Sequence, residues 1–84
     1  MEQELGKITH FFDKISVAVL RIEEGSLNVG DKIHVKGAIT DFLQTVDSMQ
    51  VEHRSVESAK SGDAIGMKTA EPVRAGDIVF KVSA

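Results

Sequence analysis

The sequence predicts an all-β fold, a small antiparallel β-barrel of about six strands. The first indication is composition: Val and Ile together number seventeen against only four Leu, and β-branched residues favour strands over helices. The second is a Gly-Asp pair that stands before an apolar stretch three times. Gly tolerates positive φ and Asp bonds nearby backbone amides, so this pair suits a tight corner between strands. The pairs are Gly30-Asp31, Gly62-Asp63 and Gly76-Asp77.

The 84 residues suffice for one domain spanning 1–84, with the barrel itself from about 5 to 83. Hydrophobic residues make up 42% and charged residues 27%, which is typical of a globular chain. The net charge of −3 argues against a non-specific nucleic-acid binder. Without cysteine, neither a disulfide framework nor a thiolate zinc site is expected.

The longest run of apolar side chains, Val17-Ala18-Val19-Leu20, is far below the ~20 residues that span a bilayer. The first four residues are acidic in character and lack the layout of a signal peptide. We therefore expect a cytoplasmic location and no membrane contact.

The first two strands are expected at Leu5–Phe12 and Ile15–Ile22, joined by a tight turn at Asp13-Lys14. The second strand is apolar on both faces, which means that it is covered twice or offers one face to a partner. One face carries Ala18, Leu20 and Ile22, and the other carries Ile15, Val17 and Val19.

The next strand, Lys32–Lys36, alternates cleanly, with Ile33 and Val35 inward and the cations outward. The segment Ile39–His53 is long for one strand and its phase slips. If its apolar residues Val46, Met49 and Val51 all point inward, a β-bulge is expected near Asp47-Ser48.

Helix is expected at most as a single turn over Val56–Lys60. Pro72, the only proline, falls in the connection before the last strand, where a missing amide does little harm.

The order of these segments resembles a known family. The residues that carry the likeness are Val29-Gly30-Asp31, the strand Val46 to Val51, Gly62 to Met67 and Val73 to Val79. They are similar to the second domain of elongation-factor-type translation GTPases, the translation-protein β-barrel. The stretch Gly6 to Val19 is closer still to short translation elongation factor-like proteins and to the C-terminal barrels of collagenase-like peptidases.

The resemblance implies no enzymatic activity for this chain. The sequence has no G-x-x-x-x-G-K-[ST] loop to cradle nucleotide phosphates, so GTP hydrolysis does not carry over. In collagenase-like peptidases the catalytic part lies outside this barrel. In elongation factors the corresponding strand end helps to hold the aminoacylated tRNA, which implies an RNA-contact surface here. Its residues are Met49, Gln50, His53 and Arg54.

The sequence contains no recognisable catalytic or metal-binding group. His10, His34 and His53 lie on separate strands without a local ligand pair, and His34 is interpreted as a solvated side chain. Glu23-Glu24 falls in a turn, where both carboxylates are hydrated, and no G-x-S-x-G elbow occurs. We expect no metal, no cofactor and no catalysis.

The first hairpin is the candidate protein-binding surface. Neighbouring residues on a strand face opposite ways, so one of Phe11 and Phe12 enters the core while the other points outward. The alternative is that both rings are covered. The candidate surface comprises Phe11, Phe12, Lys14, Val17 and Val19. The main hypothesis is a non-catalytic module that docks on a protein partner, GTPase-like or peptidase-like. The alternative is an accessory RNA-binding protein of the translation apparatus.

Overall fold

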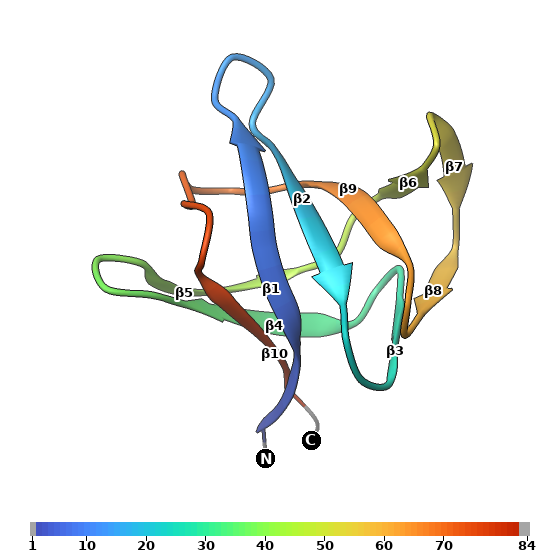
Figure 1. The fold of residues 1–84 in the computed structure, drawn as a ribbon, viewed down its shortest axis with the longest axis horizontal. Helices are drawn as coiled ribbons and strands as arrows, with labels where there is room; N and C mark the ends of the chain where they lie inside the picture. The colour runs from blue at the N-terminus through green and yellow to red at the C-terminus, as the bar shows by residue number, and fades with distance from the viewer. Residues whose placement is uncertain (1, 83–84) are drawn as a thin grey trace.

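The computed structural model describes residues 2–82, and the secondary structure of this part is entirely β. Ten short strands form two antiparallel sheets (Figure 1). The strands are β1 Glu2–Phe12, β2 Val17–Ile22, β3 Ser26–Asn28, β4 Lys32–Lys36, β5 Asp41–Thr45, β6 Met49–Val51, β7 Arg54–Val56, β8 Ser58–Lys60, β9 Ala64–Lys68 and β10 Ile78–Val82. None of these residues belongs to a helix long and apolar enough to cross a membrane.

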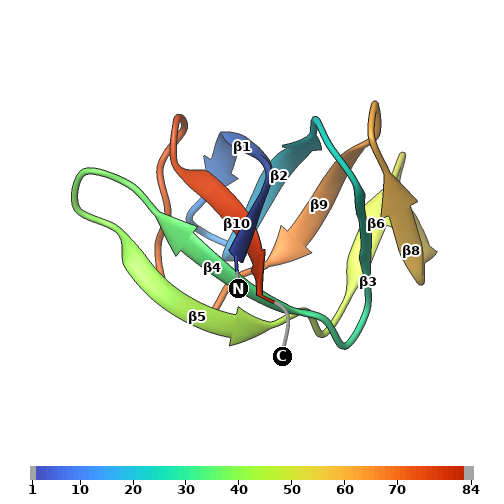
Figure 2. The same cartoon turned by 90° about the horizontal axis from the view of Figure 1, so that it is seen from below.

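The larger sheet has eight strands in the order β5-β4-β10-β1-β2-β9-β6-β7, and β3 pairs with β8 in the smaller sheet. Seen from below, the larger sheet curls around a common interior (Figure 2). The small all-β fold is therefore confirmed, with more strands than the six expected. The expected end of the barrel at residue 83 lies outside the described residues.

Within residues 2–82 the core is built from the inward faces of the strands other than β7, together with Val46 and Val73 from the segments between strands. Sixteen apolar side chains are buried: Leu5, Ile8, Ala18, Leu20, Ile22, Leu27, Ile33, Val35, Phe42, Val46, Met49, Ala59, Ile65, Met67, Val73 and Val79. β4 matches its expected bounds, with Ile33 and Val35 fully buried between exposed lysines.

The β1–β2 hairpin has a longer loop than expected. Phe12 pairs with Val17, so the connection holds four residues, Asp13 to Ser16, instead of the two-residue turn Asp13-Lys14. Ser16 has a φ of 55°, which closes the loop at a position where glycine is more usual. Ile15 consequently lies in the loop and not in the strand.

The expected bulge near Asp47-Ser48 is wrong, because the chain changes partners there. β5 pairs with β4, whereas β6 pairs with β9 and β7. Val46 and Met49 are both buried, so the phase slip is real, and it is absorbed by residues 46–48, which belong to neither strand. The register shifts occur in β1, between Glu4 and Gly6 and between Ile8 and His10.

Gly6 is required where the backbones of β1 and β2 approach closely. A Cβ at Gly6 would lie 1.9 Å from the carbonyl oxygen of Arg21. The helical turn expected over Val56–Lys60 is also wrong, because this segment continues from β7 into β8. There it pairs with Ser26–Asn28, which a local sequence pattern does not indicate.

The three Gly-Asp pairs form the same tight turn, as predicted. In each, the aspartate N–H donates to the carbonyl three residues earlier at 3.0 Å, and its carboxylate accepts the N–H of that earlier residue at 2.8–3.1 Å. The glycines have φ values of 97°, 95° and 98°, as a type II turn requires. The turns are Asn28–Asp31, Lys60–Asp63 and Arg74–Asp77.

Each turn also holds one buried residue of another segment. The glycine N–H donates to that residue's carbonyl, and the residue's own N–H donates to the aspartate carbonyl, at 2.7–2.9 Å. The residues held in this way are Val46, Ile22 and Ile8. One local device thus fixes three corners of the barrel.

Candidate functional site

An apolar groove crosses the outer surface of the larger sheet, between the β1–β2 loop and the β6–β7 turn. Both connections rise on the upper side of Figure 1, with β9 between them. The groove has a volume of about 300 Å³. Its lining residues are Phe12, Ile15, Val17, Val19, Gln50, Glu52, His53, Ala64, Ile65 and Gly66.

The exposed apolar side chains of the groove come from the first hairpin. Phe12 is 47% exposed and Ile15 is 60% exposed, whereas Val17 and Val19 are half-buried. Phe11 lies opposite the buried Ala18 and packs against the core, so Phe12 is the ring that points outward. The Phe12 ring contacts the imidazole of His10, with ring centres 4.4 Å apart.

Gly66 lies at the centre of the groove floor. It pairs with Val19 on one side and with Gln50 on the other. A Cβ added there would meet a methyl group of Val17 at 3.5 Å, which is ordinary contact, so the position has room for a side chain that the sequence leaves out. A glycine within a strand can mark a close approach by a ligand or another chain. Gly66 is thus the feature of the sequence that could have indicated this part of the groove.

The groove joins residues from both surfaces that the sequence singled out. Phe12, Val17 and Val19 come from the expected protein-binding hairpin, and Gln50 and His53 come from the expected RNA-contact strand end. Lys14 is exposed in the adjoining loop and Arg54 begins β7 beside the turn. The expectation that Met49 contacts RNA is wrong, because Met49 is 1% exposed, faces the core and is not available for contact.

Sequence reasoning placed Ile15 on the apolar face with Val17 and Val19 without naming it for the candidate surface, and it missed four lining residues: Glu52, Ala64, Ile65 and Gly66. Ala64, Ile65 and Gly66 join the groove because β9 pairs with both β2 and β6, and Glu52 joins it because it lies in the turn after β6. This pairing is long-range and leaves no local pattern.

The backbone at both ends of the groove is strained. Glu52 and His53 have φ values of 51° and 66°, which makes the β6–β7 connection a two-residue turn that usually contains glycine or asparagine. Ser16 in the β1–β2 loop is the third non-glycine residue with positive φ among residues 2–82. Each such residue costs about 1 kcal/mol, so strain is concentrated beside the groove.

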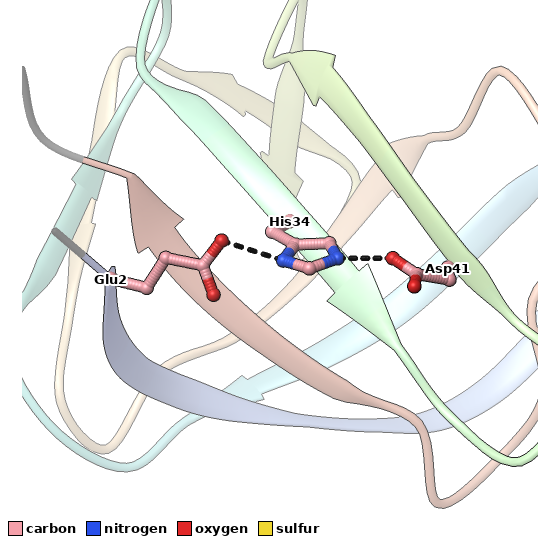
Figure 3. A network of polar contacts seen from close by, with 3 residues as sticks. All are labelled: Glu2, His34 and Asp41. Carbon is pink, nitrogen blue, oxygen red and sulfur yellow. Dashed lines mark hydrogen bonds and ion pairs between the residues drawn. The ribbon is translucent and has the colours of Figure 1, made fainter.

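His34 was expected to be solvated, and the structure corrects this. The half-buried ring is held between the carboxylates of Glu2 and Asp41, with Nδ1 2.6 Å from Glu2 and Nε2 bonded to Asp41 (Figure 3). The hydrogen bond to Asp41, followed by that to Glu2, raises the pKa of His34, and the same bond lowers the pKa of Asp41.

This arrangement does not bring ligands together on a metal ion. The two carboxylates lie on opposite sides of the ring, because they bond to different nitrogens. Within residues 2–82, no three side chains of histidine, aspartate or glutamate are grouped so that they could hold a metal ion.

The chain is similar in sequence to much longer proteins. It is 38% identical over 78 residues to an uncharacterised protease of Methanocaldococcus jannaschii, and 33% identical over 78 residues to a collagenase of Porphyromonas gingivalis. These alignments cover 92% of this chain but only 19% and 22% of the relatives, so the chain spans about a fifth of their length. No family model matches the sequence.

The fold matches two crystal structures of the C-terminal domain of a Geobacillus thermoleovorans protein described as a U32 peptidase. The TM-scores are 0.86 and 0.87 at 15% and 16% identity, and the alignments cover 92% and 94% of this chain and 96% and 91% of those chains. These relatives do not support the resemblance to elongation factors, which stays a prediction. The chain is thus similar to a small part of collagenase-like proteases, and it has the fold of a U32 peptidase C-terminal domain.

Proposed function

We propose that this domain is a non-catalytic binding module that docks on a protein partner through the groove of the first hairpin. The observation that carries the proposal is the position of Phe12 and Ile15, two large apolar side chains exposed at the rim of a preformed depression. Fully burying such a side chain is worth about 1.5–3 kcal/mol, so a partner that covers both gains substantial affinity. Exposed apolar clusters on small domains commonly mark interaction sites.

The relatives support a non-catalytic role. About four-fifths of each relative lies outside the part that matches this chain, so the activities named for those proteins need not reside here. The ten lining residues of the groove include neither serine, threonine, cysteine nor lysine, and the two ionisable ones, Glu52 and His53, are exposed neighbours in a turn. A peptidase-like protein is the partner class that these relatives favour.

RNA binding is the second candidate function. The contact between the His10 and Phe12 rings, with Gln50 and His53 across the groove, offers stacking and polar groups to an unpaired base. Under this alternative, Arg54→Ala weakens RNA binding and reduces its salt dependence.

The test compares two glutamate substitutions on opposite parts of the surface. Val17→Glu places a charge in the groove, and Leu43→Glu is the control, because Leu43 is 57% exposed on β5 and does not line the groove. We expect wild-type protein and Leu43→Glu to retain the same protein from source cells after ribonuclease treatment, and Val17→Glu to lose it while its thermal unfolding stays cooperative.

Retention of that protein by Val17→Glu would contradict the proposal. Because the chain has no Trp or Tyr, bound nucleic acid dominates its ultraviolet spectrum. An absorption band at 260 nm that disappears after ribonuclease treatment, with no protein then left bound to the domain, would favour RNA as the partner instead.

A further inference from the structure

The charged residues on the paired segments of the three strands that carry the groove floor are all of one sign. The paired segments 6–12, 17–22 and 64–68 of β1, β2 and β9 contain three charged residues, Lys7, Arg21 and Lys68, and all three are exposed cations. This local excess stands against a net charge of −3 for the chain. The groove lining itself contains one carboxylate, Glu52 in the β6–β7 turn, and the three cations flank it without lining it. Asp13 lies in the β1–β2 loop at the other end.

Two of these cations oppose each other directly. Lys7 and Arg21 are cross-strand partners on β1 and β2, an arrangement of like charges that destabilises a sheet. The ion pairs among residues 2–82 include none of Lys7, Arg21 and Lys68, and Glu23, which follows β2, does not neutralise Arg21. The pair of cations does not stabilise the fold in any evident way. It would, however, attract an anionic partner.

The strand register arranges the face in three parallel rows. Val17 lies between Phe12 and Lys68, Val19 lies between His10 and Gly66, and Arg21 lies between Lys7 and Ala64. Successive rows are two residues apart on β2 and β9, about 6.5 Å along a strand, and the register shift in β1 makes Lys7 and His10 three residues apart. The floor at Gly66 is therefore midway between a cation on one side and two cations on the other.

We propose that the groove accepts an extended protein segment with carboxylates at its first and fifth positions and a large apolar side chain at its third. In an extended chain these three side chains point the same way and are spaced about 6.5 Å apart, which is the spacing of the rows. The apolar side chain covers Gly66 between Val17 and Val19, and the carboxylates pair with Lys68 and with Lys7 and Arg21. This inference rests on the proposed protein-docking function and adds the chemistry of the partner.

The experiment titrates defined peptides into the isotopically labelled 84-residue protein and follows its backbone amides by NMR. The first peptide has glutamate at positions one and five, phenylalanine at three and serine between them. The second has the same composition with both glutamates adjacent, the third replaces glutamate by lysine, and the fourth replaces phenylalanine by serine. We expect the first peptide to bind most tightly and to shift the amides of Val19 and Gly66.

Charge variants of the protein test the role of the cations. Replacing Lys7, Arg21 or Lys68 by glutamine, one at a time, lowers the affinity for the first peptide by about two- to fivefold. The matched controls are Lys32→Gln, Lys36→Gln and Lys60→Gln, each made singly on β4 or β8, which change the net charge by the same amount and leave the affinity unchanged. Gly66→Leu fills the floor of the groove and is expected to abolish binding of the first peptide. If this variant does not fold, Gly66→Ala is measured in its place and is expected to weaken binding.

The outcomes separate the two proposals. If all phenylalanine peptides bind equally whatever their charge, the carboxylate pattern is wrong and the docking groove stands. If no phenylalanine peptide shifts the groove amides at millimolar concentration, docking itself fails. If a mixed-sequence RNA oligonucleotide shifts them instead, the RNA alternative replaces it.

Discussion

At the scale of single residues, His34 shows how one side chain connects several strands. Its ring lies on β4, its two carboxylate partners come from β1 and β5, and the ring of Phe80 on β10 lies 6.2 Å away, centre to centre. A protonated imidazole donates to both carboxylates, which is the stronger form of hydrogen bond. The charge state of His34 therefore affects how firmly one side of the sheet is held.

We predict that this cluster stabilises the protein more at pH 5 than at pH 9. The pKa of His34 is raised by its bonds to Asp41 and Glu2, so its contribution is fully present below the ordinary value of 6.5 and is lost as the pH rises through the raised value. The pKa of Asp41 is lowered, so its contribution is lost only as the pH falls below its ordinary value of 3.8. The gain is largest between these limits.

The measurement is thermal unfolding of wild type and His34→Gln across this pH range. The difference in midpoint temperature is expected to be larger at pH 5 than at pH 9. His53→Gln is the control, since His53 forms no hydrogen bond to a carboxylate among the described residues and lies in a turn. An equal difference at both pH values would show that His34 acts only through packing.

At the scale of secondary-structure elements, the three Gly-Asp turns offer an internal comparison. Asp77 is buried, 5% exposed, whereas Asp31 and Asp63 are partly accessible to water. Replacing any of them by alanine removes the acceptor for one backbone N–H. Only at Asp77→Ala is that N–H, on Arg74, left in a partly buried site where water replaces the lost bond poorly.

We therefore predict that Asp77→Ala destabilises the protein by about 2–3 kcal/mol, and Asp31→Ala and Asp63→Ala by about 1 kcal/mol each. Denaturant unfolding of the three variants measures this order. Equal losses at all three turns would indicate that the hydrogen bond, and not its burial, determines the cost.

The same elements show what a sequence can and cannot predict. β4 and the three turns follow from local alternation and from Gly-Asp chemistry, and both were predicted correctly. The division of Ile39–His53 into β5 and β6 was not, because hydrophobic phase records which side chains are inward and not which strand is the partner. Residues 54–60 were missed for the same reason, since β8 is defined by pairing with β3.

The candidate site follows the same division. The apolar outer face of β2 was evident, because alternate positions carried valine where a solvated strand carries polar residues. The meeting of that face with the β6–β7 turn was not, since it depends on β9 pairing with both β2 and β6. The residues named for protein binding and for RNA binding were treated as two surfaces, and the fold makes most of them one.

At the scale of the whole molecule, the two edges of the larger sheet are not joined by strand pairing. β7 is one edge and β5 is the other, and the side chain of β5 residue Gln44 reaches the end of the inner strand β9 and not β7, so that β5 and the end of β9 lie side by side. The side chain of Gln44 connects them: its Nε2 donates to the carbonyl of Lys68 at 3.0 Å, and its Oε1 accepts the N–H of Ala70 at 2.8 Å. One amide side chain thus substitutes for a pair of ladder hydrogen bonds.

We predict that Gln44→Leu destabilises the protein by about 1–2 kcal/mol, because two backbone groups lose their partner at once. The amide of Ala70 should also exchange with solvent faster than in the wild type, whereas the amides of the three Gly-Asp turns should not. Gln50→Leu is the matched control, because the exposed Gln50 side chain makes no such bond among residues 2–82. Unchanged exchange at Ala70 in Gln44→Leu would mean that side-chain packing, and not this amide, closes the barrel.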